Sequence, residues 1–235
     1  MTNKYDNGSL KSILEDVFKD EKLGNCKTRI VVPAFHINTL KPYVYKTAHH
    51  KRFERDYKVK IVDIAMESTA APTYFKLYRG ENDILCIDSG IGANNPTFLG
   101  VAEAIGVLEW PIDEIQVLSL GCTEESCELN NDENKIPKGQ AHYAAQITDL
   151  FMKSQDGYSD GLTRILLRVN EHRDRYVRIN QKVSRKAYAL GKVNEITIKN
   201  LKGLATSAER KYLSQINGFF KEKAEKFEPI YKLEE

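Results

Sequence analysis

One segment of the sequence places a carboxylate where parallel α/β sheets do chemistry. The apolar run of residues 84–87 ends at Asp88, which is followed by Ser89 and Gly90. A strand is therefore expected to deliver the carboxylate into a glycine-containing turn. Ligands and catalytic groups collect at the carboxyl ends of strands in open parallel sheets. Asp88 is either a catalytic carboxylate or a turn residue that accepts hydrogen bonds from nearby amides, and its position alone does not separate the two.

Two serines are candidates for a nucleophile to accompany that carboxylate, and neither has the expected setting. Ser68 is not preceded by a strand that ends in the glycine turn an exposed nucleophile requires. Ser89 is adjacent to Asp88, so in extended geometry its side chain points away from that of Asp88. All 235 residues contain no G-x-S-x-G. The sequence thus supplies a candidate base without a candidate nucleophile.

The histidines and cysteines form no pattern that indicates catalysis or metal binding. His49 and His50 are adjacent, hence divergent, in a basic segment with no acidic residue directly beside them. Structural or surface roles are expected for all five histidines, which are His36, His49, His50, His142 and His172. The four cysteines, Cys26, Cys86, Cys122 and Cys127, include no C-x-x-C pair. We therefore predict reduced thiols, with no metal and no cofactor.

The elements that must position Asp88 alternate between strand and helix. Hydrophobic periodicity, capping residues and prolines predict helices and strands in turn. They are a helix over 9–20, a strand over 28–32 that stops at Pro33, a helix over 61–70, a strand over 84–87, a helix over 94–108 and a strand over 115–120. This alternation predicts parallel strands ending near Val32, Ile87 and Leu120, joined by helical crossovers.

The remaining segments are expected to lie outside that sheet. We predict a long excursion over 38–60, a surface loop over 123–135, a helix over 140–153, a strand over 162–169 and helices over 193–226. No repeat or convincing linker interrupts the chain. The simplest organisation is one domain over 1–235, with a helical basic C-terminal region from about 181.

The net charge of +2 hides an asymmetry along the chain. Residues 1–163 hold 18 Lys and Arg against 24 Asp and Glu, whereas residues 164–235 hold 17 against 9. The basic C-terminal third indicates either an anionic partner, such as nucleic acid or a lipid surface, or the solvated faces of amphipathic helices. The solvated faces are the simpler interpretation. No apolar run reaches the ~18 residues of a membrane span, and a cytoplasmic protein is expected.

Several short motifs in a fixed order give the chain a resemblance to a known family. The motifs include Thr28–Phe35, Pro42–His50, Ser68–Phe75, Asp88-Ser89-Gly90 with Ala93–Pro96, and Leu118–Gly121, and Arg175–Asn180 continues them more weakly. From Lys4 to about Gly121 the chain resembles the patatin-like phospholipase family. That resemblance implies an α/β, patatin-like fold with a parallel-sheet core and flanking helices.

The resemblance also implies a chemistry for Asp88. Enzymes of the family hydrolyse acyl esters of lipids with a serine–aspartate dyad and no catalytic histidine. The serine lies in a G-x-S-x-G elbow, a glycine-rich loop supplies oxyanion-hole amides, and the aspartate of a D-G-G or D-G-A turn acts as general base. Asp88 matches that aspartate, with Ser89 and Gly90 as its supporting turn.

The sequence departs from the family pattern in two places. Ser89 stands where the family usually has glycine, so it would be strained if the turn needs a positive φ. The glycine-rich loop and the G-x-S-x-G precede the matched region in the family, so these elements and the domain's N-terminal strands are expected to be missing. We therefore expect the C-terminal portion of a lipid acyl hydrolase that is inactive alone. The alternative is a non-catalytic binding or regulatory protein on the same scaffold.

The expected partners follow from this interpretation. A lipid or acyl ester is the substrate of the complete enzyme, and a complementary N-terminal fragment or a second copy is expected to cover the exposed seam. Contact with a membrane is expected to be peripheral at most, and no specific nucleic acid is expected. The resemblance also permits a response to nucleotide signals, as in some bacterial members of the family.

Overall fold

The computed structural model describes residues 3–81, 83–125, 147–184, 187, 188, 191 and 193–234. Contacts divide the chain into two compact units. Unit 1 contains Met1–Glu109, Thr148–Ser159 and Glu225–Glu235. Unit 2 contains Trp110–Ile147 and Asp160–Ala224. The prediction of a single domain stays a prediction.

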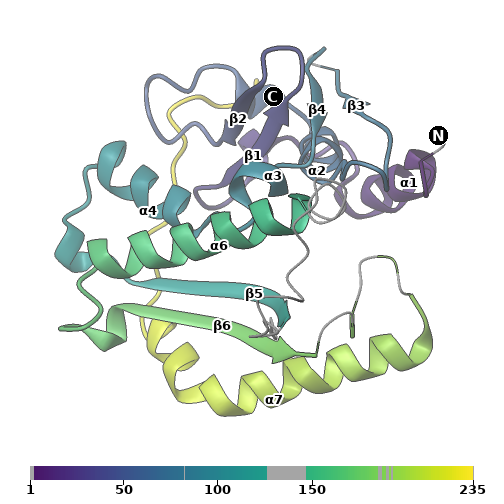
Figure 1. Cartoon of the computed structure of the whole chain (residues 1–235). Helices are drawn as coiled ribbons and strands as arrows, with labels where there is room; N and C mark the ends of the chain where they lie inside the picture. Colours follow the sequence, from purple (N-terminus) through teal and green to yellow (C-terminus); the bar gives the residue numbers. More distant parts are fainter. Residues whose placement is uncertain are drawn as a thin grey trace. The chain divides into compact units, whose positions relative to one another are not determined.

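Unit 1 is built on a four-stranded sheet in the order β2-β1-β4-β3 (Figure 1). The strands are β1 (Val31–His36), β2 (Lys41–Lys46), β3 (Tyr78–Arg79) and β4 (Leu85–Ile87). β1 and β2 form a hairpin with Val31 opposite Lys46 and His36 opposite Lys41. β4 then pairs antiparallel with β1, where Phe35 lies opposite Ile87. β3 pairs antiparallel with the other side of β4.

Helices flank the sheet of unit 1. They are α1 (Asn7–Phe18), α2 (Ile61–Ser68), α3 (Gly90–Ala93) and α4 (Thr97–Gly106), with short 3₁₀ helices η1 (Leu23–Asn25) and η2 (Asp56–Lys58). Asp6 caps the N-terminus of α1, and its carboxylate accepts a hydrogen bond from the Gly8 amide at 2.8 Å. α2 packs on β1 and β4. One hydrophobic cluster of the core contains Leu23, Ala34, Tyr45, Ile64 and Cys86.

Unit 2 contains the parallel pairing of the chain. β5 (Val117–Glu125) and β6 (Tyr176–Val183) run side by side, with Val117 opposite Tyr176 (Figure 1). α7 (Glu195–Phe219) packs on this pair through Ala208, which clusters with Val177 and Ile179. The 3₁₀ helices η3 (Ile112–Glu114) and η5 (Arg173–Arg175) precede the two strands. α6 (Ile147–Leu166) contributes its N-terminal part to unit 1 and its C-terminal part to unit 2.

The mixed α/β class is confirmed, and the parallel pair β5–β6 is present. The predicted parallel arrangement of the strands ending near Val32 and Ile87 is wrong, because β1 and β4 pair antiparallel. Residues 69–84, between α2 and β4, include β3 and bring β4 into the sheet in the opposite direction. A crossover helix alone would have kept the strands parallel.

Strand boundaries also differ from the sequence predictions. β1 continues through Pro33, which was predicted to end it. Hydrogen-bonded and non-hydrogen-bonded residue pairs alternate between β1 and β2, and Pro33 belongs to a non-hydrogen-bonded pair. Its backbone nitrogen points away from β2, so the missing N–H costs no hydrogen bond to that strand. β5 likewise continues past Gly121 to Glu125, with a register shift between Leu120 and Thr123.

Two other segments were assigned incorrectly from sequence. The stretch 38–60 was predicted to lie outside the core, but it contains β2 and the fully buried Tyr45. The predicted strand over 162–169 belongs mostly to α6. The buried face of that helix includes Ser159 and Thr163, so small polar residues conceal the helical period. The predicted loop over 123–135 and helix over 140–153 fall partly outside the described residues.

β5 and β6 approach each other closely at Gly121, and a substitution there tests this contact. A Cβ atom at position 121 would lie 2.6 Å from Asn180 Oδ1 and 2.7 Å from its Cγ. We expect Gly121→Ala to lower the free energy of unfolding by about 1–3 kcal/mol, because the strand or Asn180 must shift. Urea unfolding followed by circular dichroism measures this change.

The matched control is Gly203→Ala in α7, where an added Cβ meets no atom within 4 Å. This exposed helical position should gain roughly 0.5–1 kcal/mol from the better helix propensity of alanine. Equal effects of the two substitutions would contradict the proposed crowding at Gly121.

Candidate functional site

Asp88 stands directly after β4, held by the backbone on both sides. Its amide donates a hydrogen bond to the Ala70 carbonyl at 3.0 Å. The Gly90 amide donates to Asp88 Oδ1 at 2.6 Å. A Cβ at position 90 would come within 3.0 Å of the same oxygen and 3.5 Å of Met152 Cε. The glycine therefore gives its amide close access to the carboxylate.

The electrostatics of Asp88 come from burial rather than from a cation. Burial raises the pKa of the Asp88 carboxyl above its ordinary value of 3.8, and the hydrogen bond from the Gly90 amide opposes this rise. Burial favours the neutral acid, so the ionised carboxylate is a stronger proton acceptor than a solvated one. This is the electrostatic property expected of a general base.

Ser89 fits the turn without strain. Its φ of −70° and ψ of −12° lie in the right-handed helical region, and it precedes the first residue of α3. The expectation that serine would be strained at this position is therefore not met, because the turn here does not need a positive φ. The turn accepts serine where the family pattern usually has glycine.

Side chains of α6 fix the backbone that follows the Asp88 turn. Gln155 accepts from the Asn95 amide at 2.7 Å and donates to the Asn95 carbonyl at 3.2 Å. Ser159 Oγ accepts from the Phe98 amide at 3.1 Å. Asn95 Oδ1 in turn accepts from the amide and hydroxyl of Thr97. These bonds anchor the start of α4 to α6, and neither Gln155 nor Ser159 was identified from sequence.

Ser68 is engaged in the fold. Its hydroxyl donates to the Pro33 carbonyl at 2.8 Å, on the side of β1 that faces away from β2. The interaction joins the end of α2 to β1. A serine whose proton is committed to a backbone carbonyl is not prepared for deprotonation by a carboxylate.

His49 has the acidic partner that its sequence neighbours do not provide. Its Nε2 lies 3.0 Å from Glu103 Oε1, and its Nδ1 lies 2.9 Å from Thr47 Oγ1. Lys46 Nζ bonds the other oxygen of Glu103 at 2.5 Å. Burial lowers the pKa of His49, with the hydrogen bond to Glu103 opposing, so the imidazole is neutral at pH 7. This buried network ties β2, through Lys46, and the nearby His49 to α4. His49 and Glu103 are 54 residues apart, so a sequence pattern does not reveal their contact.

Of the other histidines, two contact residues close by in the sequence, one precedes a short helix, and one lies outside the described residues. His36 Nδ1 lies 3.1 Å from Thr39 Oγ1, and His50 Nδ1 accepts from the Arg52 amide at 3.2 Å. His172 directly precedes η5. His142 lies outside the described residues.

A second buried network surrounds Glu67, which sequence analysis did not select. The Tyr45 hydroxyl donates to Glu67 Oε2, and burial raises the pKa of Glu67 above its ordinary value of 4.5. Burial next to this carboxyl also raises the pKa of the Cys86 thiol to about 12. The sequence signal was available: Asp63 and Glu67 are four residues apart inside an otherwise apolar predicted helix. Such carboxylates share a helix face and need partners when buried.

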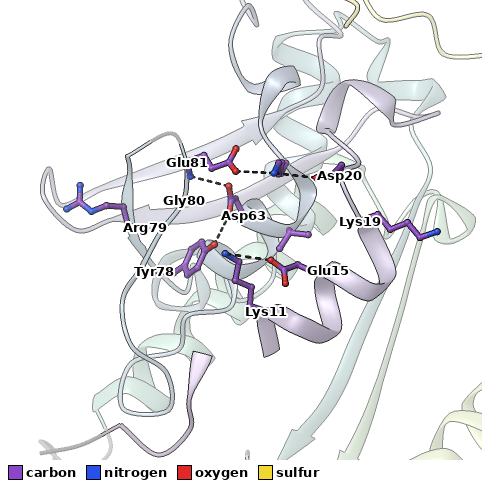
Figure 2. A pocket seen from close by; sticks show the side chains of 11 residues that line it. Lys11, Glu15, Lys19, Asp20, Asp63, Tyr78, Arg79, Gly80 and Glu81 are labelled. Carbon is purple, nitrogen blue, oxygen red and sulfur yellow. Dashed lines mark hydrogen bonds and ion pairs between the residues drawn. The ribbon is translucent and has the colours of Figure 1, made fainter. Parts of the chain in front are cut away.

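A polar pocket of about 520 Å³ opens beside Asp63. Asp63 accepts from the Tyr78 hydroxyl at 2.7 Å and from the Glu81 amide at 3.1 Å. Lys60 lies 3.0 Å from Glu81 and 3.4 Å from Asp20. Figure 2 shows these paired groups at the centre, with Lys19 and Arg79 extending away on opposite sides. Four basic and four acidic residues line the pocket, so its charges balance overall: Lys11, Lys19, Lys60 and Arg79 against Glu15, Asp20, Asp63 and Glu81.

The thiol and metal predictions can be followed only for described residues. Cys26, Cys86 and Cys122 are free thiols, and Cys86 is fully buried as expected. Cys127 lies outside the described part of the chain. Within that part, no group of His, Cys, Asp and Glu side chains is suited to hold a metal ion. Nor does any helix there have the length and apolarity needed to cross a membrane.

Comparison with known proteins relates this site to a family. Residues 1–100 match the model of the patatin-like phospholipase family. The chain is 30% identical to a "cGAMP-activated phospholipase" of Pseudomonas aeruginosa, over 70% of this chain and 49% of that protein. It is 33% identical to a protein of the same name from Vibrio cholerae, over 54% of this chain and 38% of that protein. Patatin-like protein 4 of Arabidopsis thaliana is 24% identical over 86% of this chain and 56% of its own length. The chain thus spans about half or less of the two bacterial relatives.

The raised pKa of Asp88 predicts a stability change with a defined sign. A protonated Asp88 stabilises the fold below about pH 3.8, and this contribution is lost as the pH rises through the folded-state pKa. We expect Asp88→Asn, which keeps an acceptor for the Gly90 amide, to be more stable than the parent at pH 7. The difference should vanish below pH 3.8 in urea unfolding measured from pH 3 to 8.

Asp113 provides a control of opposite sign. The hydrogen bond from Arg175 at 2.9 Å lowers the pKa of its carboxyl. Asp113→Asn should therefore lose stability at pH 7, and the loss should disappear in acid. A destabilised Asp88→Asn at pH 7 would show that Asp88 is held by favourable interactions rather than penalised by burial.

Proposed function

We propose that this chain, whose residues 1–100 match the model of the patatin-like phospholipase family, is the C-terminal portion of a lipid acyl hydrolase in which Asp88 is the general base. The observation that carries the proposal is the half-buried Asp88 carboxylate at the end of β4. Burial raises its pKa, and the hydrogen bond from a single backbone amide, that of Gly90, lowers it. Such a group is suited to accept a proton from a serine hydroxyl.

The nucleophile in this proposal comes from a segment that these 235 residues do not contain. The sequence has no G-x-S-x-G. The hydroxyl of Ser68 is bonded to the Pro33 carbonyl, and Ser89 occupies the turn next to Asp88. An incoming serine and its oxyanion-hole amides would complete the dyad, and without them little stabilisation of the transition state remains.

One side of β1 supports the idea of a complementary segment. β4 pairs only with Phe35 and His36 of β1, so residues 31–34 face no strand on that side within the described ranges. The Ser68 hydroxyl takes the Pro33 carbonyl there. This open side of β1 lies next to the strand that carries Asp88. A complementary N-terminal segment, or a second copy of the chain, would cover it.

The proposed substrate is a lipid or another acyl ester, as for the family. The two bacterial relatives are named as cGAMP-activated, so the assembled enzyme should be assayed with and without this nucleotide. The alternative function is a non-catalytic binding or regulatory protein that retains the scaffold and Asp88. The two proposals differ in whether a complementary segment restores hydrolysis.

Ester hydrolysis measured with and without that segment tests the proposal. The purified chain should hydrolyse a p-nitrophenyl ester no faster than buffer. Addition of a separately produced patatin-like segment with a glycine-rich loop and G-x-S-x-G should produce turnover and raise the melting temperature. A stabilisation of about 2 kcal/mol corresponds to roughly 4–8 °C for a protein of this size.

Two substitutions identify the catalytic group in that assay. Asp88→Asn should abolish the restored turnover while keeping most of the rise in melting temperature, because it removes the base but keeps most of the surface that the segment would cover. Ser68→Ala should retain turnover. A sharply melting monomer that is indifferent to the segment would favour the non-catalytic binding protein instead.

A further inference from the structure

α6 buries polar side chains and exposes large apolar ones. Gln155 and Ser159 hold the start of α4 through hydrogen bonds, and Thr163 is fully buried. On the other side of the helix, the exposed fraction of large apolar residues runs from 44% at Leu162 to 76% at Ile165. A helix on the surface of a folded protein normally has the reverse arrangement. The exposed side of α6 is therefore a candidate interaction surface.

The exposed apolar residues form one stripe along α6. At 100° per residue, every large apolar residue that the described part of the helix exposes falls within a sector of about 120°. The sector contains no charged residue. The nearest one, Arg164, lies about 100° from its centre and is paired with Asp160 at 2.7 Å. We call this surface the α6 outer face, and its members are Ile147, Leu150, Phe151, Ser154, Tyr158, Gly161, Leu162 and Ile165.

Small residues interrupt the large ones along the middle of the α6 outer face. Positions 147, 151, 154, 158, 161 and 165 are spaced alternately four and three apart, which is the repeat by which two helices interlock. Ser154 and Gly161 lie on either side of Tyr158 in this row, so one ring stands between two recesses. A Cβ added at position 161 would meet no atom within 4 Å. The recess at Gly161 can therefore receive a side chain from a partner.

We propose that the α6 outer face joins two copies of this chain as an antiparallel helix pair. A two-fold axis at the level of residue 156 sets each residue opposite the one that is equally far from 156 on the other side. Phe151 of one copy then lies opposite Gly161 of the second copy. Tyr158 likewise lies opposite Ser154, and the isoleucines at the two ends of the face meet each other. The face is thus complementary to itself, as a two-fold interface requires.

The charge and size of the α6 outer face favour a second copy over other occupants. Nucleic acid or an anionic lipid surface would need basic side chains along the face, and it has none. Two uncharged faces, by contrast, meet without like-charge repulsion. Six large side chains at about half exposure present on the order of 600 Å², close to the ~800 Å² per partner of a standard interface. The proposal goes beyond the proposed hydrolysis, which uses none of these residues.

Sedimentation of the purified chain over a concentration series tests the proposal. A reversible monomer–dimer equilibrium is expected in the micromolar range, because the interface is at the small end of specific ones. Phe151→Gln should raise the dissociation constant about a hundredfold, since the dimer loses two buried rings and each contributes about tenfold. The matched control is Ile13→Gln in α1, at a helical isoleucine that is 61% exposed, which should leave the equilibrium unchanged.

Gly161→Leu tests the antiparallel pairing itself. The monomer should accept leucine without loss of melting temperature, because the position is open and leucine is the better helix former. In the dimer the leucine would occupy the space of the opposing Phe151. Dimerisation should therefore weaken about tenfold or more, because the overpacked contact occurs twice. Adding Phe151→Ala should restore affinity, whereas Gly203→Leu, at an equally open glycine of α7, should have no effect on dimerisation.

Several results would overturn the proposal. One is a chain that stays monomeric across the series, and another is a dimer that Ile13→Gln weakens as much as Phe151→Gln. Failure of Phe151→Ala to restore affinity to the Gly161→Leu variant would exclude the antiparallel pairing. If the α6 outer face instead belongs to the complementary segment of the proposed hydrolase, that segment should dissociate the dimer and Phe151→Gln should block its binding. Circular dichroism verifies the folding of each variant, and sedimentation is independent of esterase activity. Failure here is therefore distinguishable from failure of the proposed function.

Discussion

The Asp88 site depends on holding a half-buried carboxylate at the end of a strand without a cation to neutralise it. Two backbone bonds fix the residue: its amide donates to the Ala70 carbonyl, and its carboxylate accepts from the Gly90 amide. Burial raises its pKa, and the Gly90 amide recovers only part of that cost. The surrounding fold must supply the stability that this arrangement lacks. The bonds from Gln155 and Ser159 of α6 to the start of α4 contribute to it.

Two other buried acidic groups of unit 1, Glu103 and Asp63, are treated differently. Glu103 is paired with both Lys46 and His49, and Asp63 accepts two hydrogen bonds from Tyr78 and Glu81. Buried carboxylates are stable when their oxygens have such partners, and removal of one partner is costly. Asp88 differs because its pKa is set by burial, which raises it, and by one backbone amide, which lowers it. A carboxylate kept this way is costly for stability, which supports the proposed catalytic role. Glu67, whose pKa burial also raises, has the Tyr45 hydroxyl as a partner instead.

Sequence reasoning succeeded where the local pattern determines the structure. The apolar run before Asp88 and the glycine after it predicted the strand and turn, and both are present. It failed where contacts between segments far apart in the sequence determine the structure. Nothing local distinguishes an antiparallel β1–β4 pair from a parallel one, because the reversal is produced by residues 69–84. Likewise, Glu103 becomes the partner of His49 only after folding brings α4 to β2. The α6 helix was missed because its buried Ser159 and Thr163 are polar.

The proposed completion of the dyad has a thermodynamic consequence for Asp88. A serine hydroxyl that donates to the carboxylate favours its ionised form, and so opposes the effect of burial on the pKa. Linkage makes this coupling reciprocal: whatever lowers the pKa of Asp88 is itself bound more tightly by the ionised protein. A complementary segment would therefore associate more strongly as the pH rises through the folded-state pKa of Asp88. The unfavourable burial of one carboxylate thus acts, in the proposed enzyme, as part of the driving force that brings the two parts of the active site together.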